Sequence, residues 1–196
     1  MMSTCCRVGE ICKARLADVD LVQRTWRIRA DVAKNRREHI VFLSGFAIDI
    51  LGRLKTRAEQ LGTEWLMPAR NKLDSPVCEK SLSKQIGDRQ RGDRPPMKGR
   101  SKTMHANSLA LSGGRWTPHD LRRTASTLMG ELGVLDQVIE RCLNHAEENK
   151  IKRTYQRQQL LAARKDAFAL LGQKLEELAG LRDSGSADVQ ICSAND

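Results

Sequence analysis

The sequence is poor in aromatic residues and contains no long apolar run. Only 4% of its 196 residues are aromatic, and Tyr155 is the single tyrosine. No stretch approaches the roughly eighteen consecutive apolar residues that indicate a transmembrane helix, and no signal peptide precedes the first motif. We therefore expect a soluble chain that is not exported, does not contact a membrane and works in the cytoplasm.

The cysteines form neither a zinc pattern nor a disulfide pattern. The six are Cys5, Cys6, Cys12, Cys78, Cys142 and Cys192. No two of them have the C-x-x-C spacing of zinc sites, and the adjacent pair near the N-terminus does not easily build a disulfide framework. We predict six reduced thiols, with Cys142 a small buried residue inside a helical pattern. No metal site and no cofactor are expected.

Acidic residues are outnumbered by basic ones, 24 Asp and Glu against 34 Lys and Arg. The formal charge of +10 predicts a polyanionic partner, because neutralising phosphates is the commonest use of such an excess. A surface that is merely solubilising is the alternative. The scarcity of aromatic side chains leaves little surface for stacking on unpaired bases, which argues against a simple RNA-binding protein.

Hydrophobic periodicity predicts a mostly helical α+β domain. Two β-leaning runs, Thr25–Arg29 and Glu38–Leu43, flank a polar turn and predict an antiparallel hairpin near the N-terminus with Lys34 near its tip. Residues 65–68 are a candidate third strand. Apolar residues at helical spacing predict the other elements. Helices are expected over about 44–61, 75–86, 117–132, 138–143 and 161–178, after two short helical pieces within residues 1–16.

Two segments are predicted to lie outside this regular structure. Residues 88–114 combine proline, glycine and cations, which is typical of a mobile loop. Its cations could follow a phosphate backbone or simply be solvated. Residues 181–196 are small and polar and are expected to form a disordered tail, so residues 1–180 form the folded domain.

Tyr155, His119 and Arg122 are residue types that can break a phosphodiester without a metal ion. A phenol is a nucleophile that can form a covalent phosphoester, and a guanidinium matches phosphate oxygens. His119 and Arg122 are three residues apart at a predicted helix start, so both reach one side, where the helix N-terminus adds positive partial charge. Each has a plainer alternative. These are a helix cap for His119, a surface cation for Arg122 and a half-buried aromatic for Tyr155.

Four further residues extend this set, again with alternatives. Arg7 and Glu10 form either a surface ion pair or a pair in which the carboxylate holds the guanidinium ready for phosphate. Lys34 is either a solvated lysine or a general acid that reaches a leaving oxygen. His145 is either a structural histidine at a turn or a phosphate contact.

The order of these motifs resembles the catalytic domain of the tyrosine recombinases, the phage integrase family. In order they are R-x-x-E from Arg7, the hairpin lysine, H-D-L-R-R-T from His119, Asn144-His145 and Tyr155. Residues 116–125 and 131–145 are similar to the family's signature region. Residues 144–157 look closest to integrases of prophages and genomic islands, and the whole resemblance spans about residues 3–180.

The resemblance implies strand cleavage without a metal ion, with Tyr155 as the nucleophile. Tyr155 would take the 3′-phosphate and free a 5′-hydroxyl, while Arg7 and Arg122 clamp the scissile phosphate. His119 would assist deprotonation of the phenol, whose ordinary pKa is about 10. Because the phosphotyrosine keeps the bond energy, resealing would need no ATP.

The same resemblance implies supporting roles and partners. His145 would hydrogen-bond the phosphate, Lys34 would protonate the leaving oxygen, and Glu10 would support the first arginine. Double-stranded DNA at attachment sites would be the partner, and four protomers would exchange strands, with the last helix able to dock on a neighbour. Further DNA contacts are expected from Arg36, Arg37, Lys98, Arg100, Lys102, Arg123, Lys152 and Arg153.

The chain also departs from the family's pattern. Cys5-Cys6 stand where Thr-Gly is usual, and no N-terminal DNA-clamp domain precedes the catalytic domain of residues 1–180, so we expect a truncated or fragmentary integrase. One alternative keeps the fold but not the activity, namely a remnant that binds DNA without recombining it. A type IB topoisomerase is another alternative, which the prophage-like residues 144–157 disfavour.

Overall fold

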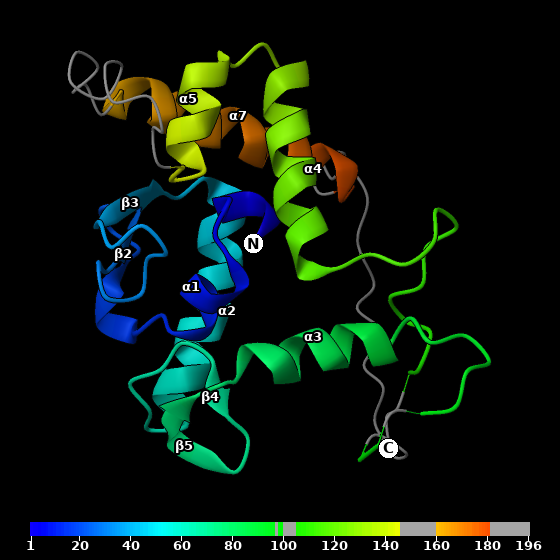
Figure 1. The fold of residues 1–196 in the computed structure, drawn as a ribbon. Coiled ribbons are helices and arrows are strands. Elements are labelled where there is room, and N and C mark those ends of the chain that lie inside the picture. Colours follow the sequence, from blue (N-terminus) through cyan, green and yellow to red (C-terminus); the bar gives the residue numbers. More distant parts are fainter. Residues whose placement is uncertain (97, 100–104, 146–159, 181–196) are drawn as a thin grey trace, which may run out of the picture.

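The computed structural model describes residues 1–96, 98–99, 105–145 and 160–180 (Figure 1). It confirms the predicted α+β class, with helices as most of the regular structure and a three-stranded antiparallel sheet near the N-terminus. Among the described helices none is both long and apolar enough to span a membrane.

The N-terminal residues form short turns around one brief helix. A 3-10 turn, η1 (Met2–Thr4), precedes α1 (Val8–Cys12), and a second 3-10 turn, η2 (Leu16–Asp18), follows. Cys5 lies between η1 and α1 in the left-handed region with φ 49°, which ends the first turn. The two predicted helical pieces are therefore present but shorter than a typical helix.

The cysteines behave as the sequence predicts wherever they are described. Five lie in the described residues and all five are free. Burial raises the pKa of Cys12 and of Cys142 to about 12, so both thiols stay protonated and unreactive at neutral pH. Cys192 lies outside the described residues.

The sheet contains the predicted hairpin and one strand that was not predicted. Its order is β1 (Val19–Asp20), β2 (Thr25–Ile28) and β3 (His39–Phe42), and β2 pairs with β3 in the register Ile28↔His39. The apolar side chains of Trp26, Ile28 and Val41 are buried in the core. Lys34 lies in the connection between β2 and β3, as predicted.

The first long helix is confirmed, but the predicted third strand does not join the sheet. α2 (Gly45–Gln60) is capped by Ser44, whose hydroxyl accepts the N–H of Ala47 at 3.3 Å. After it, β4 (Pro68–Ala69) pairs only with β5 (Lys72–Pro76), which makes a separate two-stranded sheet. Of residues 65–68, therefore, only the last belongs to a strand, and it lies away from the main sheet.

The predicted start of the next helix, at Ser75-Pro76, is wrong. These residues end β5, where a proline is tolerated because the strand finishes there, and Val77 N–H donates to the Met67 carbonyl at 2.8 Å. α3 begins three residues later than Pro76, after the N-cap residue Cys78, and spans Glu79–Asp88. Residues 88–114 were expected to be loose, but the first of them, Asp88, belongs to α3 and its side chain is buried.

Three helices at the other end of the molecule complete the core, and all three were predicted (Figure 1). They are α4 (Pro118–Glu131), α5 (Asp136–Cys142) and α7 (Leu161–Leu178). α7 packs on α2, α4, α5 and η1, and its Phe168, Leu171 and Leu175 are buried. The structure thus shows this last helix packed on its own chain.

Gly172 lets α7 approach the start of α2 closely, and this contact predicts a change in stability. A methyl group at Gly172 would overlap the Ser44 side chain. We expect Gly172→Ala to lower the free energy of unfolding by about 1–3 kcal/mol. In the control Gly130→Ala, the new methyl meets Ile139 Cδ1 at 3.9 Å, an ordinary contact. That variant should gain about 0.5–1 kcal/mol from helix propensity.

Urea denaturation followed by circular dichroism measures both changes. Midpoints that move in the same direction for the two variants would contradict the close approach of α7 to α2.

Candidate active site

Arg7 and Glu10 form a fixed pair at the start of α1, not a loose surface pair. Arg7 Nη1 donates to Glu10 Oε1 at 3.0 Å, and the backbone N–H of Arg7 donates to Glu10 Oε2 at 2.7 Å. The Glu10 side chain is only 2% exposed, whereas that of Arg7 is 26% exposed. One buried carboxylate thus holds both the backbone and the side chain of Arg7 and leaves the guanidinium open on one side.

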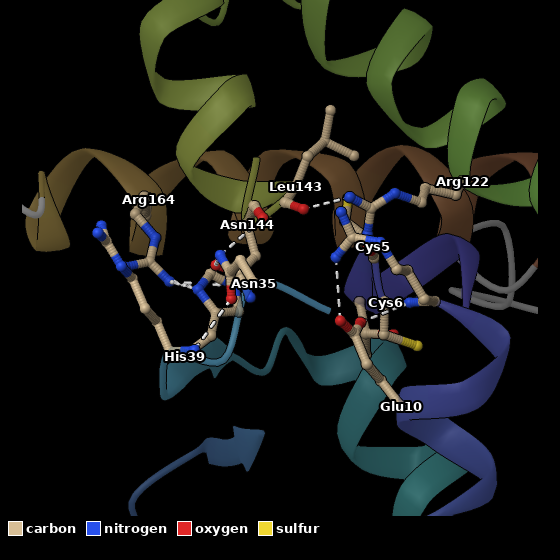
Figure 2. A network of polar contacts seen from close by, with 12 residues as sticks. Cys5, Cys6, Glu10, Asn35, His39, Arg122, Leu143, Asn144 and Arg164 are labelled. Carbon is tan, nitrogen blue, oxygen red and sulfur yellow. Dashed lines mark hydrogen bonds and ion pairs between the residues drawn. The ribbon is translucent and has the colours of Figure 1, made fainter. Parts of the chain in front are cut away.

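Arg122 is buried and joins two segments that are distant in sequence (Figure 2). Its Nη1 donates to the carbonyl of Cys5, two residues before Arg7, and its Nη2 donates to the carbonyl of Leu143, two residues before His145. Burial, followed by the positive charge of Arg7, lowers the pKa of Arg122. The alternative of a surface cation is therefore wrong, and the charges of Arg122 and Arg7 are close enough to repel each other.

His119 is exposed near the start of α4 but does not cap this helix. Thr117 is the cap residue, and both its N–H and its hydroxyl donate to Asp120 Oδ2, at 2.8 and 2.7 Å. These bonds lower the pKa of the Asp120 carboxyl. His119 lies one turn before Arg122 on the same helix, with its imidazole accessible.

A buried glutamine holds the segment that leads into α4, and sequence reasoning missed it. Gln90 Nε2 donates to the Trp116 carbonyl at 3.0 Å, and Trp116 N–H donates to Gln90 Oε1 at 2.9 Å. This reciprocal pair imitates a β-bridge between the end of α3 and the approach to His119. A lone glutamine in a basic stretch carries no sequence signal for such a contact.

His145 lies at a tightly bonded helix end. Its N–H donates to the Glu140 carbonyl at 3.1 Å and Asn144 N–H donates to the Arg141 carbonyl at 3.2 Å, the pattern of a Schellman motif. Asn144 has φ 50°, the left-handed conformation that this motif requires. His145 Nδ1 also lies 2.6 Å from Glu140 Oε2, and its side chain is 42% exposed.

The hairpin that carries Lys34 reaches this same turn. Asn35 Nδ2 donates to Asn144 Oδ1 at 2.8 Å and to the Asn144 carbonyl at 3.3 Å. Figure 2 shows the two amides facing each other between Arg164 and Arg122. Lys34 itself is exposed.

A histidine and an arginine that sequence reasoning missed complete the polar network of Figure 2. Arg164, in the first turn of α7, donates to the Ile40 carbonyl and lies within 3.4 Å of His39 Nδ1. Its guanidinium carbon lies 5.6 Å from the centre of the Phe42 ring. Burial, followed by the charge of Arg164, lowers the pKa of His39 to about 3. His39 is therefore neutral at physiological pH.

The remaining predicted residues divide into exposed ones and ones that lie outside the described residues. Arg36, Arg37 and Lys98 are exposed, and Arg123 is 70% exposed and paired with Asp120 at 3.1 Å. The predicted residues that lie outside the described ranges are Tyr155, Arg100, Lys102, Lys152 and Arg153. Across the described residues, no cluster of three or more His, Cys, Asp or Glu side chains could hold a metal ion.

Comparison with known proteins assigns the class. The model of the phage integrase family matches residues 1–160, and the chain belongs to this family. It is 29% identical over 183 residues to the prophage integrase IntA of Escherichia coli (strain K12), and 26% identical over 177 residues to the integrase of Shigella phage Sf6. These matches cover 93% and 89% of this chain but only 38% and 40% of the relatives. The chain thus spans less than half of their length.

Solved structures agree on the fold. The XerA recombinase matches with a TM-score of 0.58 at 19% identity, over 90% of this chain and 54% of that one. The integrase from mycobacterium phage Brujita matches with a TM-score of 0.55 at 16% identity, over 87% and 48%. The predicted fold, that of a tyrosine recombinase catalytic domain, is confirmed.

The neutral state of His39 predicts a dependence of stability on pH. Its pKa is about 3 in the folded chain against an ordinary 6.5, so between these values the unfolded chain binds more protons. This contribution to stability is complete above pH 6.5 and is lost progressively toward pH 3, by up to about 1.4 kcal/mol per pH unit.

Urea denaturation at pH 7 and pH 5 tests this expectation. His39→Gln should lose about 2 kcal/mol less than the wild type between these two pH values. Equal losses in both proteins would mean that His39 is not held neutral in the fold.

Proposed function

We propose that this chain carries the catalytic site of a site-specific DNA recombinase, which cleaves and rejoins strands through a 3′-phosphotyrosyl intermediate. The Tyr155 oxygen forms a bond to phosphorus as the bond from phosphorus to the 5′-oxygen breaks. The phenol proton passes to His119, and the leaving 5′-oxygen takes a proton from Lys34. Integration or excision of a mobile element would be the outcome in the complete protein.

The observation that carries this proposal is the excess of positive charge around Arg7 and Arg122. Burial, followed by the charge of Arg7, lowers the pKa of Arg122. Within the part of the chain that the structure describes, Glu10 is the one carboxylate that bonds to Arg7. Both Arg122 bonds go to neutral carbonyls. Such an arrangement fits an anion that gains charge during reaction, because the cations then stabilise the transition state more than the ground state.

The surroundings of the two arginines supply the other groups that the chemistry needs. His119 lies one turn from Arg122, and Leu143, to which Arg122 donates, is two residues before His145. The hairpin with Lys34 contacts that same turn through Asn35. We assign phosphate binding to His145 and support of Arg7 to Glu10.

The role proposed for Tyr155 is supported by the residues on its two flanks. Ten residues before it, His145 is fixed by the turn that Arg122 contacts, and nine residues after it, Arg164 fixes α7 to β3. Both ends of the segment that carries Tyr155 are therefore attached to the network of Figure 2. A segment tethered in this way can present its phenol to a phosphate held between the arginines.

We assign contacts with the duplex to the exposed cations around this site and to basic residues outside the described ranges. They are Arg36, Arg37, Lys98, Arg100, Lys102, Arg123, Lys152 and Arg153. Assembly of four protomers on DNA stays a prediction for the complete protein.

Tyr155→Phe tests the nucleophile. Nicked duplexes that cover the DNA on both sides of the gene serve as suicide substrates, because cleavage beside a nick releases a short strand and traps the covalent intermediate. The wild type should give a protein–DNA adduct that persists on a denaturing gel with EDTA present, and Tyr155→Phe should give none while still binding DNA.

Two results would count against the proposal. DNA binding without any adduct would favour the alternative of a DNA-binding remnant. An adduct that requires Mg²⁺ would contradict cleavage by arginine, histidine and lysine alone.

Arg122→Ala should reduce cleavage far more than binding, since its contact strengthens as charge builds on the phosphate. We expect about a 100-fold to 1,000-fold loss of cleavage rate at saturating DNA and a loss of binding of only a few fold. Arg123→Ala, at the exposed neighbouring position, should have the opposite effect. It should weaken DNA binding and leave the cleavage rate at saturating DNA nearly unchanged. Equal losses of both, in an Arg122→Ala protein whose circular dichroism spectrum and urea midpoint match those of the wild type, would exclude the assigned role.

A further inference from the structure

Asn35 connects the hairpin to the end of α5 through both ends of its amide. Its Nδ2 donates to Asn144 Oδ1 at 2.8 Å and to the Asn144 carbonyl at 3.3 Å, across 109 positions of sequence. Its Oδ1 accepts the N–H of Arg37 at 3.1 Å, which closes a local turn. The side chain therefore fixes the shape of the hairpin tip and attaches that tip to another part of the fold.

The backbone on the other side of Lys34 is fixed as well. Ala33 is buried in the core, its N–H donates to the Arg29 carbonyl at 3.0 Å, and its carbonyl accepts the N–H of Arg36 at 3.0 Å. Lys34 thus lies between the buried Ala33 and the hydrogen-bonded Asn35, while its own side chain is exposed. A lysine in a ten-residue connection would otherwise sample many positions, because both its loop and its four-carbon side chain are mobile.

Asn144 is an unusual residue for its position, and its side chain gives the reason. α2 and α4 also end in left-handed residues, and there the position is filled by glycine, Gly62 with φ 64° and Gly133 with φ 80°. Asparagine tolerates this conformation less well than glycine but supplies an amide. At Asn144 this amide oxygen accepts the shorter of the two bonds from Asn35.

We propose that Asn35 and Asn144 form a positioning clasp that aims the amine of Lys34 at the leaving 5′-oxygen. This inference rests on the proposed function, in which Lys34 gives up the proton. The two amides do not touch the DNA in this proposal. They hold the hairpin tip against the turn that Arg122 already contacts, so that the acid and the phosphate-binding arginines share one rigid frame. A general acid depends on such alignment for its effect.

The test compares two forms of the nicked duplex that gives an adduct with the wild type. One carries the natural oxygen at the leaving 5′ position, and the other carries sulfur there, which leaves as a stable thiolate and needs no proton. Lys34→Ala should slow cleavage of the oxygen duplex by about 100-fold or more and leave the sulfur duplex nearly unaffected.

Variants of the clasp should follow the pattern of Lys34→Ala. Asn35→Ala and Asn144→Gly should each lower the cleavage rate of the oxygen duplex by about tenfold or more. The sulfur duplex should be cleaved at nearly the wild-type rate. Asn144→Gly keeps the left-handed turn at no steric cost and leaves the Arg37 bond intact. Because the ratio of the two rates is independent of the folded fraction, lower stability cannot imitate this result.

A double variant and a matched control sharpen the test. Asn35→Ala combined with Lys34→Ala should be no slower than Lys34→Ala alone, because no acid then remains to be positioned. Asn107→Ala removes a comparable asparagine bond, from Gly92 N–H to Asn107 Oδ1 at 2.9 Å, in a different loop, and should leave both rates unchanged.

The possible failures can be told apart. Equal slowing of the two duplexes by the clasp variants, or no slowing of either, overturns the clasp as a positioning device while strand cleavage stands. If Lys34→Ala slows cleavage of both duplexes equally, Lys34 is not the general acid. The clasp then has no acid to position and is overturned. A wild type that forms no adduct on either duplex overturns the proposed function itself.

Discussion

The site depends on two hydrogen bonds from one buried guanidinium. Arg122 donates to the carbonyls of Cys5 and Leu143, and thereby joins α4 to the N-terminal turn and to the end of α5. Since each carbonyl is two residues from a predicted site residue, Arg7 or His145, the same bonds set the positions of both. A lysine in this place could not span two carbonyls, because its ammonium lacks the planar fork. Arg122 therefore holds together the part of the fold in which the predicted site residues lie.

The network is also notable for the charges that it leaves unbalanced. Burial, followed by the charges of Arg164, Arg122 and Arg7, lowers the pKa of His39, so this buried histidine stays neutral among three cations. Holding cations together in a protein interior costs free energy unless an anion joins them. In the proposed function, a DNA phosphate provides that anion. Part of the positive charge counted in the composition thus lies within this network.

Much of this could be predicted from the sequence, and the failures have physical causes. The hairpin and the helices with strong apolar periodicity, such as α4 and α7, were predicted correctly because burial of one face determines them. The helix start at Ser75-Pro76 was wrong because local capping signals were outweighed by strand pairing with β4. Contacts such as Gln90 with Trp116 or Asn35 with Asn144 depend on which distant segments meet, and local sequence does not encode that.

The anchoring of α7 has a consequence for any exchange of this helix between protomers. Its first turn is held by Arg164 on the Ile40 carbonyl, and farther along Gly172 fits against Ser44. Removing the helix from this position would uncover the buried cation of Arg164 and break the close fit between Gly172 and Ser44. Exchange of this helix between protomers, which stays a prediction, would have to break both contacts before the helix could dock elsewhere.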